Sequence, residues 1–125
     1  MSDATQALQR TTYGAVFGRV LLDKRRTAGM EQEDVAEALG VSQSTYSRIE
    51  RGGVSVTLDM LSRLAAFYGA APSVLVGDAD RAANALRNMG VEVLADRSTR
   101  DGEIMLALLG GAALAALITV ALAKK

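Results

Sequence analysis

The segment from 32 to 51, QEDVAEALGVSQSTYSRIER, constrains the fold of this chain more than any other part of the sequence. Apolar residues recur at helical spacing on both sides of Gly40, which predicts two short helices joined by a tight turn. Gly40 suits the left-handed conformation that ends a helix, and Ser42 is a favoured N-cap for the helix that follows. Tyr46 and Ile49 are predicted to point inward, with the Tyr46 hydroxyl reaching the surface. This pattern is typical of a helix-turn-helix.

The outward face of the second predicted helix is polar throughout. Glutamine and arginine can form paired hydrogen bonds with adenine and guanine in the major groove, and serine can contact bases or phosphates. For an isolated helix a merely solvated face would be the better interpretation, but beside a tight turn and a partner helix the pattern favours DNA contact. The candidate DNA-contacting residues on this face are Gln43, Ser44, Ser47, Arg48 and Arg51.

Composition excludes several classes of function. The chain has no cysteine and no histidine, which rules out disulfides, thiolate or imidazole metal sites and Cys/His nucleophiles. Its 14 Lys/Arg balance 14 Asp/Glu, so any DNA contact must come from local placement of charge. The acidic residues fall on predicted solvated helix faces without convergent partner types. We therefore expect neither enzymatic activity nor a bound metal or cofactor.

Helical periodicity continues on both sides of the motif and predicts an all-α domain over residues 1–77. Residues 1–12 are expected to be a frayed lead-in, followed by a helix over 13–27. A last short helix is predicted to begin at Pro72 and to end at Gly77. Between them, Thr57 is predicted to cap a helix whose buried stripe comprises Leu58, Leu61, Leu64, Ala65 and Tyr68.

The helix over 13–27 ends in three consecutive basic residues, Lys24, Arg25 and Arg26. Positive charge in a last turn complements the helix dipole, which is the structural interpretation of this run. Contact between Lys24 or Arg26 and a DNA phosphate is the functional alternative.

The segment 17–76 resembles the XRE or Cro-repressor type of helix-turn-helix family. The resemblance is carried by the motifs 32–36 (QEDVA), 39–45 (LGVSQST) and 49–52 (IERG). It implies a five-helix, lambda-repressor-like DNA-binding domain in a sequence-specific transcriptional regulator. The second helix of the motif would then lie in the major groove of double-stranded DNA.

The resemblance also implies roles for individual residues. Gln32 would contact a phosphate, Gln43 would contact a base edge, and Arg25 and Glu50 would form a structural ion pair. Glu31 stands where the family has Ser or Thr. This departure is expected to remove a favoured cap and to bring negative charge close to the phosphate contact.

Residues 78–103 are predicted to be a linker that contains one short amphipathic helix, ended by Gly90. The four residues 91–94 alternate like a strand but are too few to form a sheet alone. Residues 104–123 then form an uncharged run of twenty residues. As a helix, such a run would span about 30 Å, the thickness of a bilayer core.

The tail 104–123 therefore predicts a membrane-spanning helix, with a helix buried in the core of an oligomer as the alternative. The basic pair 124–125 follows the run and acidic residues precede it, which opposes the positive-inside rule for a cytoplasmic N-terminal domain. The sequence thus predicts a cytoplasmic DNA-binding domain with an inner-membrane anchor, and self-association through the tail. The alternatives are a soluble multimer, or a protein-binding helix-turn-helix on a membrane-anchored scaffold, similar to cell-shape proteins of the RodZ type.

Overall fold

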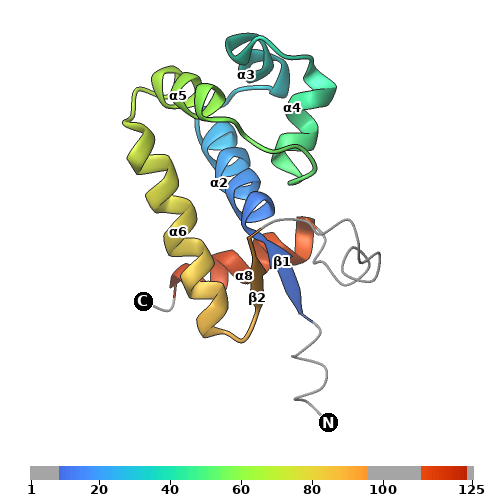
Figure 1. Ribbon diagram of the computed structural model, residues 1–125, viewed down its shortest axis with the longest axis vertical. Coiled ribbons are helices and arrows are strands. Elements are labelled where there is room, and N and C mark those ends of the chain that lie inside the picture. The colour runs from blue at the N-terminus through green and yellow to red at the C-terminus, as the bar shows by residue number, and fades with distance from the viewer. Residues whose placement is uncertain (1–8, 96–110, 124–125) are drawn as a thin grey trace.

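The computed structural model describes residues 9–95 and 111–123 of the chain. Its described part is mostly helical, with one short pair of strands. In Figure 1, the helix pair α3–α4 lies at one end of the molecule, and the strands and the last helix lie at the other. The elements are β1 (Arg10–Thr12), α2 (Tyr13–Thr27), α3 (Gln32–Leu39), α4 (Gln43–Glu50), α5 (Leu58–Phe67), α6 (Pro72–Asn88), β2 (Glu92–Leu94) and α8 (Gly111–Ala123).

Helix α2 has the bounds that the sequence predicts and runs through the centre of the fold (Figure 1). The Thr12 hydroxyl caps its start by accepting a 3.0 Å hydrogen bond from the Ala15 backbone N–H. Val16, Phe17 and Leu21 are buried along it. Its neighbours are α4 on one side and α6 on the other. Helix α2 is therefore the support against which the helix-turn-helix is held.

The predicted helix-turn-helix is confirmed as α3, a turn and α4. Gly40 adopts a φ of 74°, the left-handed conformation that favours glycine at the end of a helix. Ser42 caps α4 by accepting a 3.1 Å hydrogen bond from the Thr45 backbone N–H. At the far end of α4 the backbone crosses α2 closely. A Cβ on Gly18 would lie 2.5 Å from the Ile49 carbonyl oxygen, so only glycine fits there.

Helix α5 begins after the predicted Thr57 cap, whose hydroxyl accepts a 3.1 Å hydrogen bond from the Met60 N–H. Leu64 and Ala65 are buried, as predicted. Leu58, however, is 83% exposed, so its assignment to the buried stripe is wrong. Leu58 is the first residue of α5, whereas the buried residues of this helix, Leu64 and Ala65, lie about two turns further along.

The predicted break at Gly77 is wrong, because α6 continues from Pro72 to Asn88. The buried residues Leu75, Ala79, Ala82, Ala83 and Leu86 form one stripe through this position. An interior glycine costs a helix roughly 0.5–1 kcal/mol, which burial of a continuous stripe outweighs. The predicted domain boundary at 77/78 thus falls inside a helix. The short amphipathic helix that the sequence predicts before Gly90 is the second half of α6.

The all-helical prediction is incomplete, because β1 and β2 form a parallel two-stranded sheet. Residues 10–12 belong to this sheet, so they are not frayed as predicted. Thr11 pairs with Val93, and Arg10 forms a 3.5 Å ion pair with Glu92. The sequence marks 91–94 as strand-like, but its partner lies about eighty residues earlier, a separation that local patterns do not reveal.

Helix α8 is the described part of the predicted tail helix over 104–123, and residues 104–110 lie outside the described residues. It packs against α6 and α2, where Leu114 and Ile118 are buried. With Val16, Ala82, Ala83, Leu86 and Val91 they form a second hydrophobic cluster. Among the described helices, none is by itself long and apolar enough to cross a membrane; α5 and α6 meet both criteria only as a pair bent by 102°.

Candidate nucleic-acid interface

The outer face of α4 presents the polar side chains that the sequence singles out. Gln43, Ser44, Arg48 and Arg51 are exposed and Ser47 is half-buried. Arg51 Nη1 donates a 3.2 Å hydrogen bond to Ser47 Oγ one turn earlier. Within the described residues, Arg48 has no ion-pair partner. The face thus offers amide, hydroxyl and guanidinium groups from one helix, without a carboxylate on that surface.

The side chain of Gln43 is hydrogen-bonded to Gln32, the other glutamine that is predicted to contact DNA. Gln43 Nε2 donates a 2.6 Å hydrogen bond to Gln32 Oε1. Gln32 Nε2 in turn donates a 2.9 Å hydrogen bond to Glu50 Oε1. The first residue of α3 is therefore connected to both the first and the last residue of α4.

Arg25 and Glu50 form the buried ion pair that the family resemblance implies. Arg25 Nε lies 2.7 Å from Glu50 Oε2, and Nη2 lies 3.2 Å from Oε1, a bidentate arrangement. The third nitrogen, Nη1, donates to the Met30 carbonyl at 3.0 Å. Burial acts to raise the pKa of Glu50, but the hydrogen bonds from Arg25 and Gln32 outweigh it and hold that pKa below its ordinary value. The pair links α2 to the end of α4.

Tyr46 is fully buried, so the prediction that its hydroxyl reaches the surface is wrong. Its inward direction carries the hydroxyl into the core, where burial and the nearby Glu50 carboxylate raise the pKa of Tyr46 far above its ordinary value. Burial likewise raises the pKa of Tyr68. Both phenols therefore stay neutral, with Tyr46 in the core and the half-buried Tyr68 packed against it.

A polar hollow of about 480 Å³ opens beside the two glutamines. It is lined by Arg25, Glu31, Gln32, Glu33 and Gln43. The Asp34 carboxylate accepts a 2.9 Å hydrogen bond from the Glu31 backbone N–H, so α3 receives a cap interaction despite the absence of Ser or Thr. Two glutamates at the rim of this hollow oppose an approaching phosphate, which agrees with the negative charge expected near Gln32.

The three basic residues at the end of α2 have separate surroundings. Lys24 Nζ lies 3.4 Å from an Asp78 carboxylate oxygen on α6, while Arg25 is buried against Glu50. Arg26 is exposed in the last turn. The ion pair gives Lys24 a structural role between α2 and α6, and leaves Arg26 as the residue of this run best suited to meet a phosphate.

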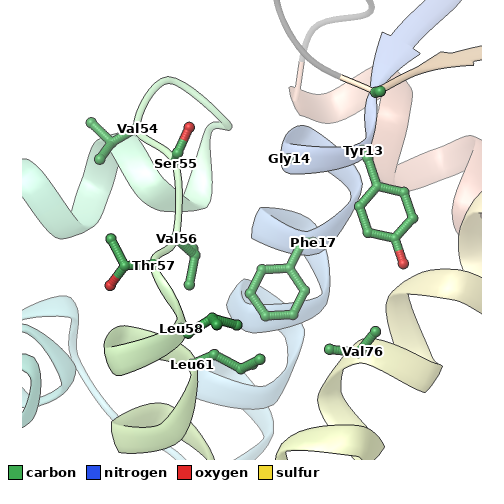
Figure 2. A pocket seen from close by; sticks show the side chains of 11 residues that line it. Tyr13, Gly14, Phe17, Val54, Ser55, Val56, Thr57, Leu58, Leu61 and Val76 are labelled. Atoms are coloured by element: carbon green, nitrogen blue, oxygen red, sulfur yellow. The ribbon is translucent and has the colours of Figure 1, made fainter.

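A second hollow, of about 260 Å³, is largely apolar and lies between α2, α5 and α6. Figure 2 shows Phe17 at its centre, with Val56 and Leu61 on one side and Val76 on the other. Leu58 lies beside Leu61 and lines the hollow while remaining largely exposed to solvent. None of the lining residues is charged. The polar side chains in its lining are the hydroxyls of Tyr13, Ser55 and Thr57, so the hollow contains no carboxylate, ammonium or guanidinium group.

Two features of the interface escape sequence reasoning. The contacts Gln32–Glu50 and Gln32–Gln43 join residues 18 and 11 positions apart on two different helices, so they depend on how α3 packs against α4 and not on the period of one helix. Arg63 of α5 also donates a 3.2 Å hydrogen bond to the Leu39 carbonyl, which satisfies the end of α3 from another helix. The signal that could reveal the first feature is the tight turn itself, because it brings α3 and α4 together and with them the polar residues Gln32, Gln43 and Glu50.

Comparison with known proteins agrees with this geometry. Residues 21–75 match the helix-turn-helix family. A curated relative, the cryptic phage CTXphi transcriptional repressor RstR of Vibrio cholerae, is 35% identical over 65 residues, which cover 52% of this chain and 59% of the relative. The alignment thus leaves two fifths of that protein unmatched. Both findings agree with the geometry of residues 21–75, which form a helix-turn-helix domain.

Proposed function

We propose that the chain binds double-stranded DNA sequence-specifically, with α4 in the major groove, and that it regulates transcription. The observation that carries this proposal is the outer face of α4, where Gln43, Ser44, Arg48 and Arg51 are exposed together. Sequence readout needs donors and acceptors that reach base edges from one rigid element. A helix capped by Ser42 and held at its far end by the buried Glu50 provides that rigidity.

Each side chain of this face has a role in the proposal. Gln43 and Arg48 contact base edges, because an amide pairs with adenine and a guanidinium with guanine. Gln32 uses its remaining N–H on a phosphate. Ser44 is short enough to let the helix lie deep in the groove. Ser47 holds the Arg51 guanidinium at 3.2 Å, and Arg51 then meets bases or backbone at the end of α4.

The test is site selection from a random duplex library, followed by binding of variants to the selected site. Gln43→Ala and Arg48→Ala should each lose roughly 1–3 kcal/mol at particular base pairs and relax the preference there. Arg26→Ala should weaken all sequences alike and flatten the salt dependence. Arg87→Ala is the charge-matched control, because Arg87 is exposed near the end of α6 that lies away from α4. Equal behaviour of Arg48→Ala and Arg87→Ala would refute the assignment and favour a protein partner.

We also propose that the protein acts as a dimer whose seam is the apolar hollow of Figure 2. A two-fold seam must be self-complementary, and here Leu58, 83% exposed, lines a hollow together with Phe17, Leu61 and Val76. Each Leu58 would enter the partner's hollow. Such a dimer would carry two α4 helices, one for each half-site of a DNA site with two-fold symmetry.

The dimer proposal is tested by sedimentation of two matched variants. Leu58→Glu should yield a monomer, whereas Val120→Glu, which charges the exposed face of α8 where Val120 is 48% exposed, should leave the dimer intact. The opposite pattern would place the seam on the tail, as the sequence prediction has it. A monomeric wild-type protein would refute the dimer itself.

For the tail, we propose a role in the fold and not as a membrane anchor. Burial of Leu114 and Ile118 against α6 supports this role, because insertion of α8 into a bilayer would uncover Ala82, Ala83 and Leu86. The full chain should therefore remain in the supernatant after membranes are pelleted without detergent. Recovery in the membrane pellet, with release only by detergent, would support the anchor that the sequence predicts.

A further inference from the structure

Glu50 occupies an unusual place for a buried carboxylate, because it supports a surface side chain as well as an ion pair. Its side chain is 1% exposed, so water does not compete for its oxygens. Both oxygens accept from Arg25, and Oε1 also accepts from Gln32 Nε2 at 2.9 Å. From Gln32 the contacts continue to Gln43, which is exposed at the start of α4.

We propose that Glu50 is a positioning residue that sets, through Gln32, the direction in which the Gln43 amide presents its donor and acceptor to DNA. This inference rests on the proposed function, because it concerns how that function selects a base. It assigns a specificity role to a residue that touches no DNA.

A carboxylate accepts hydrogen bonds but does not donate them when it is ionised. An ionised Glu50 has acceptors only, so the Gln32 amide must turn its NH₂ toward it. Gln32 Oε1 then points the other way and accepts the 2.6 Å hydrogen bond from Gln43 Nε2. A glutamine amide is otherwise nearly symmetric in shape and can be rotated by half a turn at little steric cost. Glu50 removes that freedom from both amides in succession.

The consequence appears at Gln43, whose Nε2 now faces Gln32 and α3. One N–H is used there, which leaves the second N–H and Oε1 for a base edge. Adenine offers the N7 acceptor and the N6 donor side by side in the major groove. An amide fixed in one direction matches this pair in one orientation, whereas a freely rotating amide matches either order. We call the hydrogen bonds that run from Glu50 through Gln32 to Gln43 the relay. The relay should sharpen the choice of base, and of strand, at a single position of the site.

The discriminating variant is Glu50→Gln. An amide at position 50 can donate as well as accept, so the relay can run in either direction. Arg25→Lys is the matched control, since it also damages the buried pair but leaves an acceptor-only carboxylate in place. Gln32→Leu interrupts the relay while the Arg25–Glu50 pair remains. Melting curves identify the temperature at which all four proteins are folded, and binding is compared there.

The first measurement is competition binding of the full chain between the selected duplex and duplexes with one base pair replaced. Wild type and Arg25→Lys should prefer adenine at the Gln43 position by about 5- to 150-fold, the range of one good bidentate contact. Glu50→Gln and Gln32→Leu should lose most of that preference and keep their preferences elsewhere in the site. An unchanged preference in Glu50→Gln, or an equal loss in Arg25→Lys, would overturn the positioning role.

The second measurement needs no DNA, so it separates this inference from the proposed function. In ¹⁵N spectra of the free protein, one Nε2 proton of Gln43 should be shifted away from its position in a freely exposed glutamine in wild type and Arg25→Lys, because it is hydrogen-bonded to Gln32. In Gln32→Leu this proton should return toward the position that it has in a freely exposed glutamine. If wild type selects no DNA sequence, the proposed function fails while these spectra still report the relay. Equal spectra for wild type and Gln32→Leu would refute the relay even in a protein that binds DNA.

Discussion

Removal of the Glu50 carboxylate is the perturbation whose cost the structure defines best. In Glu50→Ala, the Arg25 guanidinium keeps its 3.0 Å bond to the Met30 carbonyl but loses both contacts to Glu50. Gln32 loses its acceptor at the same time. Because Arg25 is buried, its charge is left uncompensated where water cannot replace the carboxylate.

The magnitude follows from this loss of partners. Breaking a buried ion pair from one side costs about 3–5 kcal/mol. For a chain of this size, each kcal/mol shifts the melting temperature by several degrees, so Glu50→Ala should melt about 10–20 °C below wild type. Glu33→Ala is the matched control, because Glu33 is exposed in the first turn of α3. Loss of its dipole interaction should cost about 0.3–1 kcal/mol.

The assay is thermal unfolding of the full chain followed by circular dichroism. A fragment that ends at residue 77 would be unsuitable, because it would cut α6 in its interior. The double variant Arg25→Met/Glu50→Leu should recover most of the stability, since a buried pair can be replaced by apolar residues of similar size. Equal melting shifts in Glu50→Ala and Glu33→Ala would mean that the carboxylate at position 50 is solvated, and would refute the reasoning.

Three further outcomes follow from the same packing. The pKa of Glu50 is lowered in the folded protein, so in acid the native state binds fewer protons than the unfolded state. The free energy of unfolding should therefore fall as the pH drops below 4.5. Urea unfolding should show a smaller fall in Glu50→Gln, which has no carboxylate at this position. Gly18→Ala should cost about 1–3 kcal/mol in urea unfolding, because its Cβ meets the backbone of α4, whereas Gly77→Ala, whose Cβ meets nothing, should stabilise by about 0.5–1 kcal/mol. Ile118→Asp should undock α8 and lower stability by about 1.5–3 kcal/mol, with the exposed Val120→Asp as a nearly neutral control in the same titration.

The local elements of the fold were predictable because local chemistry determines them. Thr57 and Ser42 are strong N-caps and Gly40 ends a helix, so the end of α3 and the starts of α4 and α5 follow from neighbouring residues. The continuation of α6 through Gly77 was not predictable in this way. A glycine penalty is local and visible in the sequence, whereas burial of Ala82 and Ala83 under α8 depends on a helix some thirty residues further along the chain.

In the candidate site, too, the sequence predicts what lies on one helix but not the contacts between helices. The spacing of Gln43, Ser44 and Arg48 indicates one helix face, and the structure exposes all three together. The connection from Glu50 through Gln32 to Gln43 depends on how α3 and α4 cross, which no sequence period encodes. Leu58 was predicted to be buried but is exposed. A helical stripe predicts which face of a helix is apolar, but not where along the helix the core ends.

The measurement that tests the central claim most directly is photo-crosslinking of the full chain to its selected duplex. Replacing thymines with 5-bromouracil puts the reactive atom where the thymine methyl group lies, in the major groove. Mass spectrometry of the crosslinked peptides should assign the attachment to residues of α4, from Gln43 to Arg48. Attachment to α6 or α8, or efficient crosslinking that Gln43→Ala and Arg48→Ala leave unchanged in position and sequence preference, would contradict the placement of α4 in the groove.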